Sequence, residues 1–124
     1  MLKRNRIRSL SVLCAFAPLM GATTAMGESG WVVGKVQRTL VHYDDTFGGC
    51  MALMSPSPHS VLPGCKPDWV SFDCGGTRTD PVRAYRMLDQ AQLALTTGKT
   101  ARLWVTDSTK FNGYCWALRI DVDR

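Results

Sequence analysis

The clearest pattern of apolar and polar positions lies between residues 80 and 98. Apolar residues recur there at spacings of three and four, which is the period of an amphipathic helix. The apolar face would consist of Ala84, Tyr85, Leu88, Ala91 and Leu95. The opposite face would consist of Arg83, Arg86, Gln90 and Thr97. A helix with one apolar face needs an apolar surface to pack against, so we expect a sheet or barrel beneath it.

Both ends of this segment carry residues that are typical of helix boundaries. Asp80 can accept a hydrogen bond from a free amide of the first turn. Pro81 suits the first helical position because its missing N–H would have had no partner there. Gly98 can adopt the left-handed conformation that often ends a helix. The sequence therefore predicts a helix over 81–97.

Five other runs have the β-branched, aromatic and alternating character of strands. They cover residues 31–43, 47–54, 68–74, 101–105 and 114–122. Gly34 interrupts the first run, where we expect a β-bulge in a strongly bent strand. Segment 55–66 holds three of the six prolines and is expected to be a loop. Segment 106–113 is polar and is expected to be a connection.

The alternation within these runs assigns side chains to faces. In the third strand, Val70 and Phe72 should face inward, and the outward positions are Trp69, Ser71 and Asp73. In the fourth, Arg102 and Trp104 should face outward. In the fifth, the expected inward residues are Trp116, Leu118, Ile120 and Val122, and the outward ones are Ala117, Arg119 and Asp121. Cys115 then has the outward parity while Cys74 has the inward one.

The order of three strands, a helix and two strands is that of the OB-fold. In this small Greek-key β-barrel, a helix lies between the third and fourth strands. A long, glycine-interrupted first strand fits such a barrel because that strand must curl through both halves of the wall. An open antiparallel sheet covered by one helix would satisfy the same pattern. The mainly β OB-fold is the preferred prediction.

The first 26 residues have the features of a signal peptide. Lys3, Arg4, Arg6 and Arg8 form a basic start, an apolar stretch follows over 10–20, and small residues lead to Ala25. Cleavage after Ala25 fits best, and cleavage after Gly27 also fits. We therefore expect residues 27–124 to be a single exported domain, either periplasmic or secreted. The apolar stretch is too short to span a bilayer.

Removing this leader changes the net charge. The whole chain carries 15 Lys and Arg against 10 Asp and Glu, a net charge of +5. Four of the basic residues lie in the leader, so 11 basic and 10 acidic residues remain, a net charge of +1. A domain with so little positive charge is not expected to bind nucleic acid.

The mature chain keeps four cysteines: Cys50, Cys65, Cys74 and Cys115. An even number in an exported chain indicates disulfides rather than a metal site, and no cysteine pair has metal-binding spacing. Three pairings are possible. We favour Cys50 with Cys65, bracketing the proline-rich loop, and Cys74 with Cys115. No metal and no other cofactor is predicted.

The helix end and following strand, residues 91–105, resemble a segment of the B subunit of subtilase cytotoxin and its relatives. The shared features are the Thr-Gly of residues 97–98 and the Arg-Leu-Trp of residues 102–104. A tryptophan before the helix, here Trp69, and a first cysteine pair after the second strand add to the resemblance. It implies an exported, disulfide-bonded OB-fold that binds sialylated glycans and assembles into a pentameric ring. No sugar-binding residue of the family has a matching position here.

Two tryptophans lie at outward positions beside polar side chains. Trp104 accompanies Arg102, and Trp69 accompanies Ser71 and Asp73. Sugars are bound by such combinations of a flat apolar ring and fixed polar groups. These five residues are the predicted ligand-binding positions. The competing interpretation is that the tryptophans pack beneath a loop, beneath the helix end or at a subunit contact.

Catalytic arrangements are weaker in the sequence. The candidate nucleophiles and bases, which fall in no recognisable motif, are Ser57, Ser60, Ser71, His42 and His59. Asp44 and Asp45 could bind a cation, but adjacent aspartates in a turn more often accept hydrogen bonds from the local backbone. We therefore expect no enzyme.

The sequence predicts an exported, non-catalytic binding protein that resembles a glycan-binding toxin B subunit. The alternative is a periplasmic inhibitor or protein-interaction module acting through the loop 55–66, because a rigid clipped loop loses little entropy on binding. The expected partner is a glycan or a protein, with a second copy of the chain as a further possibility.

Overall fold

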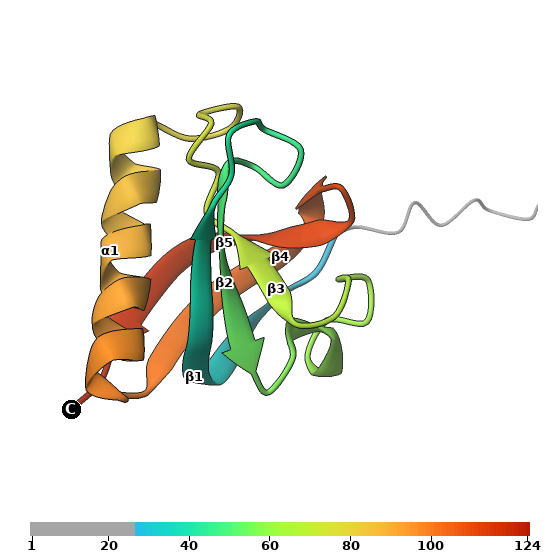
Figure 1. Cartoon of the computed structure of the whole chain (residues 1–124). Coiled ribbons are helices and arrows are strands. Elements are labelled where there is room, and N and C mark those ends of the chain that lie inside the picture. Colours follow the sequence, from blue (N-terminus) through green and yellow to red (C-terminus); the bar gives the residue numbers. More distant parts are fainter. Residues whose placement is uncertain (1–26) are drawn as a thin grey trace, which may run out of the picture.

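Five strands close into a barrel, and one helix packs against its side (Figure 1). The computed structural model describes residues 27–124, and the predicted leader and its cleavage site lie outside or at the edge of this range. The elements are β1 (Ser29–Val41), β2 (Cys50–Ser55), a short 3-10 helix η1 (Pro58–Ser60), β3 (Trp69–Ser71), α1 (Pro81–Thr97), β4 (Ala101–Phe111) and β5 (Tyr114–Val122). The hydrogen-bonded order around the barrel is β1-β2-β3-β5-β4. This order, with the helix after β3, confirms the predicted OB-fold.

β1 passes through both halves of the barrel wall. Its first part, Ser29–Gly34, pairs with β4, and its second part, Lys35–Val41, pairs with β2. The change of partner falls at Gly34, where a Cβ atom would overlap the carbonyl oxygen of Ser55. The predicted bulge at Gly34 is wrong, because the register shift lies at Gln37. Gly34 instead permits the close approach of two backbones where β1 leaves one half of the wall for the other.

The boundaries of α1 are as predicted. The Asp80 carboxylate accepts a hydrogen bond from the Val82 N–H at 3.0 Å, and Pro81 is the first helical residue. Gly98 ends the helix in the left-handed conformation, with φ of 68°. Because all three boundary residues act through local backbone geometry, sequence alone was sufficient to place them.

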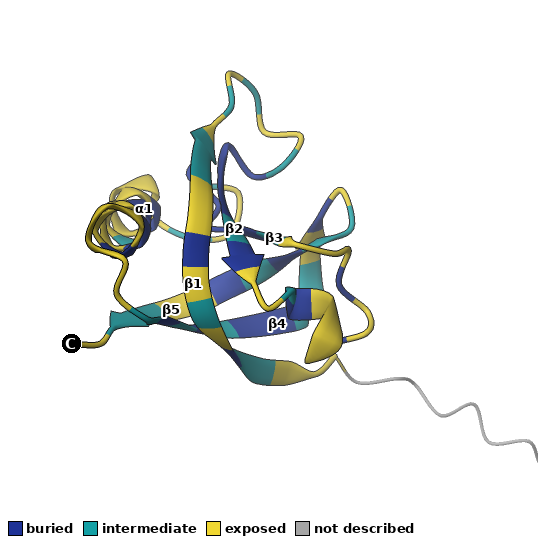
Figure 2. Cartoon of the chain, turned by 60° about the horizontal axis from the view of Figure 1, so that its bottom comes forward, coloured by how far each residue is buried: buried dark blue, intermediate teal, exposed yellow. Residues whose placement is uncertain are grey.

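The buried face of α1 is narrower than predicted. Figure 2 shows the helix nearly end-on, with its buried side against the strands and its outer side exposed. The buried residues are Ala84, Leu88, Ala91 and Ala94. Tyr85 and Leu95, predicted to be inside, are 45% and 38% exposed. The three alanines let the helix approach the barrel closely. The larger side chains on either side of this buried face, Tyr85 and Leu95, therefore remain partly exposed to solvent.

β4 and β5 form one long hairpin, so the predicted connection over 106–113 is wrong. β4 continues to Phe111, and only Asn112 and Gly113 lie between the two strands. Both have positive φ, 51° and 84°, as a type I′ turn requires. The polar end of β4 also anchors the start of β1: the Glu28 N–H donates to Asp107 Oδ1 at 2.6 Å.

An extra residue in β5 changes which of its side chains face the core. Trp104 lies opposite Arg119, but Val105 lies opposite Ala117, so Leu118 is bulged. Cys115 and Ala117 are consequently fully buried, whereas Leu118 is 42% exposed. The predicted outward position of Ala117 and inward positions of Trp116 and Leu118 are therefore wrong. The predictions for the other side of the bulge hold, with Ile120 and Val122 packed on the core.

The disulfides join Cys50 to Cys74 and Cys65 to Cys115, so the favoured pairing is wrong. The antiparallel pairing of β2 with β3 places Cys50, at the start of β2, beside the chain that leaves β3. The Phe72 N–H donates to the Cys50 carbonyl at 3.1 Å, and Cys74 follows two positions later. Sheet register thus decides the first pair.

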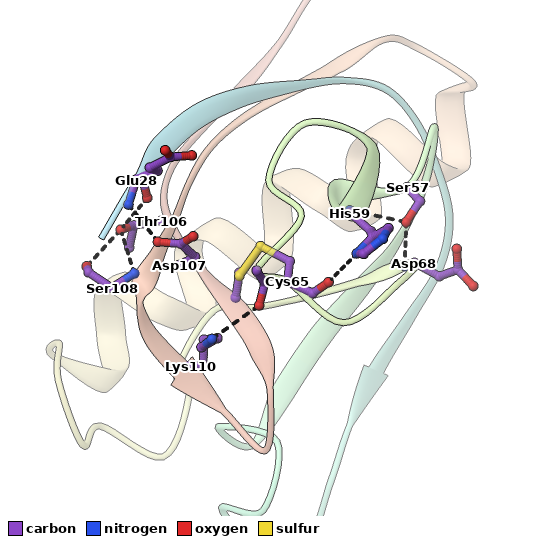
Figure 3. The surroundings of a disulfide bond; sticks show 11 residues. Glu28, Ser57, His59, Cys65, Asp68, Thr106, Asp107, Ser108 and Lys110 are labelled. Atoms are coloured by element: carbon purple, nitrogen blue, oxygen red, sulfur yellow. Dashed lines mark hydrogen bonds between the residues drawn. A yellow bond between two sulfur atoms is a disulfide. The ribbon is translucent and has the colours of Figure 1, made fainter. Parts of the chain in front are cut away.

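The second disulfide fixes the proline-rich loop to the β4–β5 hairpin. The Lys66 N–H donates to the Gly113 carbonyl at 2.9 Å. Lys110 Nζ donates to the Gly64 carbonyl at 3.2 Å (Figure 3). These contacts bring Cys65 to Cys115, a partner 50 residues away in sequence. Cysteine spacing does not show that a loop reaches across the barrel. The sequence therefore favoured the pairing of Cys65 with Cys50, which is closer in sequence than Cys115.

Candidate functional site

Two tryptophans from different strands lie side by side on the outer face of the barrel. Trp31 of β1 is the direct cross-strand neighbour of Trp104 of β4, and their ring centroids are 5.2 Å apart. Their sequence neighbours Val32 and Leu103 have no exposed surface, so strand alternation directs both indoles outward. Both rings are partly exposed. The pair forms a flat apolar surface on β1 and β4.

Two arginines flank this pair. The Arg102 guanidinium carbon lies 5.1 Å from the centre of the Trp31 ring, and that of Arg119 lies 5.5 Å from it. These distances are within the range of cation–π contacts. We call Trp31, Trp104, Arg102 and Arg119 the tryptophan–arginine platform. Arg119 also pairs with Asp121, since its Nε lies 2.9 Å from Asp121 Oδ1.

The platform borders a shallow hollow rather than a deep cleft. Trp31, Trp104 and Arg119 line a shallow hollow of about 260 Å³. Arg102 makes no ion pair or side-chain hydrogen bond with any residue between 27 and 124. An anionic group beside the Trp31 ring could therefore accept two hydrogen bonds from the Arg102 guanidinium while an apolar face of the same ligand contacts an indole.

Of the five predicted ligand-binding residues, Trp104 and Arg102 lie together in the platform. Trp69 lies elsewhere, in a second hollow of about 160 Å³. The residues that line this aromatic hollow are Leu40, Phe47, Met51, Trp69 and Tyr114. It lies over β2 and β3 beside the β1–β2 loop and the β4–β5 turn, the region through which OB-folds bind oligosaccharides and oligonucleotides. Its lining is almost entirely apolar, so it offers sugar hydroxyls few partners.

Ser71 and Asp73 are completely buried, so their predicted outward position is wrong. The Ser71 hydroxyl donates to the Phe47 carbonyl at 2.7 Å. The Asp73 carboxylate accepts backbone N–H bonds from residues 77, 78 and 79, at 3.0, 2.6 and 2.9 Å. β3 ends at Ser71, and Asp73 has a positive φ of 66°, so the alternation assumed for 68–74 does not extend to Asp73. These polar groups hold loops in place.

Trp31 and Arg119 complete the platform and were not predicted as site residues. Arg119 was expected to face outward, and it does, with 63% of its side chain exposed. Trp31 was placed in the first strand without a role. Its position beside Trp104 depends on the register between β1 and β4, which are separated by most of the chain. The sequence signal that could have indicated the pair is that Trp31 and Trp104 both lie in strands, each next to an apolar residue that faces the core.

Ser57 and His59, two of the residues considered for catalysis, lie close together, but the serine hydroxyl and the imidazole are not hydrogen-bonded to each other. The Ser57 hydroxyl accepts the N–H of His59 and the N–H of Asp68, at 3.3 and 2.9 Å. His59 Nδ1 lies 2.8 Å from the Cys65 carbonyl oxygen, which this nitrogen contacts as a donor. The histidine and the serine hydroxyl are therefore each engaged with the backbone of the loop.

The Asp44 carboxylate accepts hydrogen bonds within the β1–β2 loop, as expected for an aspartate in a turn. The N–H of Thr46 donates to Asp44 Oδ1 at 3.0 Å, and His42 Nδ1 lies 2.8 Å from the same oxygen. The backbone and hydroxyl donors of Thr46, followed by His42, lower the pKa of this carboxyl below its ordinary value of 3.8. The group is thus a local stabiliser of the loop.

Comparison of the chain with protein-family models, curated proteins and solved structures gives no significant match. Function is therefore inferred from the residues themselves. The resemblance of residues 91–105 to a toxin B subunit stays a prediction.

Proposed function

We propose that this protein is an exported, non-catalytic glycan-binding protein whose site is the tryptophan–arginine platform. The observation that carries the proposal is the outward Trp31–Trp104 pair with the Arg102 guanidinium beside it. Sugar rings present apolar C–H faces that pack on indoles, and their hydroxyls and acidic groups need fixed polar partners. The platform supplies both on rigid, paired strands.

The charge of the platform favours an acidic sugar. It contains two arginines, and only Arg119 has an acidic partner, Asp121. Arg102 is therefore available to receive a carboxylate through two parallel N–H donors, which lysine could not do with the same geometry. A sialylated glycan provides the carboxylate and an apolar ring face together. This ligand class is also the one implied by the resemblance of residues 91–105.

Export and ring assembly belong to the same proposal. Two disulfides in a domain of this size support an oxidising compartment, periplasmic or extracellular. No helix within residues 27–124 has the length and apolar character needed to cross a bilayer. The exposed Val82, Tyr85 and Leu93 on the outer face of α1 would suit contact with further copies. Native mass spectrometry of the mature protein tests the pentamer, and a single monomer peak contradicts it.

A glycan array tests the binding site directly. Wild-type protein is expected to bind sialylated glycans and to lose binding when the terminal sialic acid is removed. Trp104→Ala and Arg102→Gln should each reduce binding at least tenfold with an unchanged circular dichroism spectrum. Trp69→Ala is the matched control, because it removes a tryptophan from the aromatic hollow. Loss of binding in Trp69→Ala with full binding by Trp104→Ala would refute the platform as the site.

The loop 55–66 supports a second candidate, a protein-binding or inhibitory role. The loop is held by the Cys65–Cys115 disulfide, the η1 turn and the Lys110 contact to Gly64, yet its Val61 side chain is 40% exposed. A loop held in one conformation loses little entropy on entering a cleft. Capture from periplasmic extract that is abolished by Val61→Asp and unaffected by Trp104→Ala would favour this role over glycan binding.

A further inference from the structure

One edge of β5 has no strand beside it. β5 pairs with β4 along Ala117–Val122, but its other neighbour, β3, reaches only Cys115 and Trp116. From Ala117 onward, no strand among residues 27–124 occupies this side. Backbone groups alternate along a strand, so several N–H and C=O groups of this edge point away from β4. Such an edge is a template for another extended chain.

The open edge lies in a groove rather than on a flat surface. The groove has a volume of about 520 Å³ and runs between β5 and the first half of α1. It is lined from β5 by the consecutive residues 116–120 and from the helix side by Thr79, Arg83 and Met87. Consecutive strand residues line a groove only where the strand is approached along its edge. At roughly 3.3 Å per residue, the four open residues 117–120 offer about 13 Å of edge.

Trp116 provides a second observation at this groove. Its indole Nε1 is inaccessible and has no hydrogen-bond acceptor among residues 27–124. A buried N–H without a partner costs free energy, and a ligand carbonyl would remove this cost if the bound chain displaced the atoms that cover the indole nitrogen. Trp116 is the last residue of β5 that pairs with β3. Its neighbour Ala117 is therefore the first residue of the unpaired edge.

The charged residues that line the groove indicate the chemistry of its partner. Arg83 and Arg119 line it, and none of the lining residues is acidic. Arg119 is paired with Asp121 and belongs to the tryptophan–arginine platform, whereas Arg83 is exposed and makes no ion pair within residues 27–124. A cationic residue at the mouth of a groove favours an acidic occupant.

We propose that this groove binds an extended, acidic peptide segment, which adds to the free edge of β5 as an extra strand. Main-chain hydrogen bonds to β5 supply affinity, and an aspartate or glutamate of the peptide contacts Arg83. The groove shares Arg119 with the tryptophan–arginine platform, but the proposed peptide contact to Arg83 does not require glycan binding. A second copy of this chain is the competing occupant.

The test uses fluorescein-labelled octapeptides in which valine alternates with glutamate, lysine or serine. Fluorescence anisotropy on the intact mature protein should show binding of the glutamate peptide at least tenfold tighter than that of the lysine peptide. Arg83→Glu should reverse this preference. Arg86→Glu is the matched control, because Arg86 is on the same helix but does not line the groove; it should change binding less than twofold.

Hydrogen exchange locates the bound peptide. The amides of residues 117–120 should exchange several-fold more slowly with the glutamate peptide present, while those of the Trp31 strand stay unchanged. Unchanged exchange at residues 117–120 overturns the proposal, and so does an absence of glutamate-peptide binding at millimolar concentration. Analytical ultracentrifugation that shows a dimer protecting the same amides without peptide assigns the edge to a second copy and also overturns it.

Discussion

Trp31 and Trp104 contact each other across two strands that lie more than half the chain apart in sequence, with their ring centroids 5.2 Å apart and their ring planes tilted by 57°. Both indoles are held by strands whose alternate residues are buried, so they are fixed before any ligand arrives. A fixed apolar surface keeps the ordering cost of binding low. The closure of the barrel therefore also builds this aromatic surface on its outer face.

A double-mutant cycle measures this coupling. Trp31→Ala and Trp104→Ala, alone and together, should give an interaction energy of about 0.5–1.5 kcal/mol in urea unfolding, the range for aromatic pairs. Each single variant should also lose glycan binding, since either indole alone offers half of the surface. If the two changes in free energy of unfolding are additive, the rings are adjacent but do not stabilise each other.

The Asp73 carboxylate should be required for the loop that leads into α1. It accepts three backbone N–H bonds while fully buried. Asp73 has a φ of 66°, which asparagine tolerates, so Asp73→Asn tests the carboxylate rather than the backbone conformation. The substitution should lower the free energy of unfolding by about 1–3 kcal/mol, because an amide N–H₂ replaces one accepting oxygen.

Urea unfolding monitored by circular dichroism measures this change. Asp89→Asn is the control, since Asp89 is an exposed residue of α1 with no hydrogen bond from its side chain within residues 27–124. Equal stability of the Asp73 variant and the wild type would contradict the structural role.

Sequence predicted what depends on local interactions. The boundaries of α1 follow from Asp80, Pro81 and Gly98, which act on the nearest turn, and the strand order follows from the sequence of elements. The wrong predictions about β5 and the disulfides share one cause. Register between distant segments decides which strands pair, where the bulge at Leu118 lies and that Cys65 bonds to Cys115. No pattern within one strand carries that information.

The two disulfides should differ slightly in their contributions to stability. Cys65–Cys115 closes a segment of 50 residues and Cys50–Cys74 one of 24. Chain-entropy arguments give about 4 kcal/mol for the longer and about 3.5 kcal/mol for the shorter. Replacing each pair by serines and measuring urea unfolding checks the order, and peptide mapping without reduction checks the pairing. A Cys50–Cys65 peptide in the map would contradict the structure.

Acid should weaken the β1–β2 loop through Asp44. Hydrogen bonds, first from the Thr46 backbone, lower the pKa of this carboxyl below 3.8. A lowered folded-state pKa means that the stabilisation is present above the unfolded value and is lost as the pH falls through the folded value. NMR titration of the Asp44 carboxyl carbon should give a midpoint below 3.8. Thr46→Val, which keeps the N–H but removes the hydroxyl, should raise that midpoint, and an unchanged midpoint would exclude the hydroxyl as a cause.

The candidate site was predicted in part for a similar reason. Trp104 and Arg102 are two positions apart on one strand, so simple alternation put them on the same face. Trp31 and Arg119 come from β1 and β5, and only barrel closure brings them together. The outward positions of Ser71 and Asp73 were predicted from alternation with Val70 and Phe72, whereas here each side chain is buried and bonds to the backbone of a neighbouring loop.

Gly34 should be the glycine on which barrel closure depends most. At this residue β1 leaves β4 and joins β2, and a Cβ atom would overlap the Ser55 carbonyl oxygen and lie 2.6 Å from Pro56 Cδ. Both neighbours are fixed, one by the end of β2 and the other by its ring. Gly34→Ala should therefore force the two strands apart and cost about 1–3 kcal/mol in urea unfolding.

Gly98→Ala separates this steric effect from backbone strain. Gly98 has a φ of 68° and an added Cβ would meet nothing within 4 Å, so its cost of about 1–2 kcal/mol comes from left-handed geometry alone. Gly98→Asn should recover part of that loss, because asparagine adopts this geometry more readily, whereas Gly34→Asn should be worse than Gly34→Ala. Recovery at both positions would mean that Gly34 is needed for conformation rather than for the close approach of β1 to the end of β2.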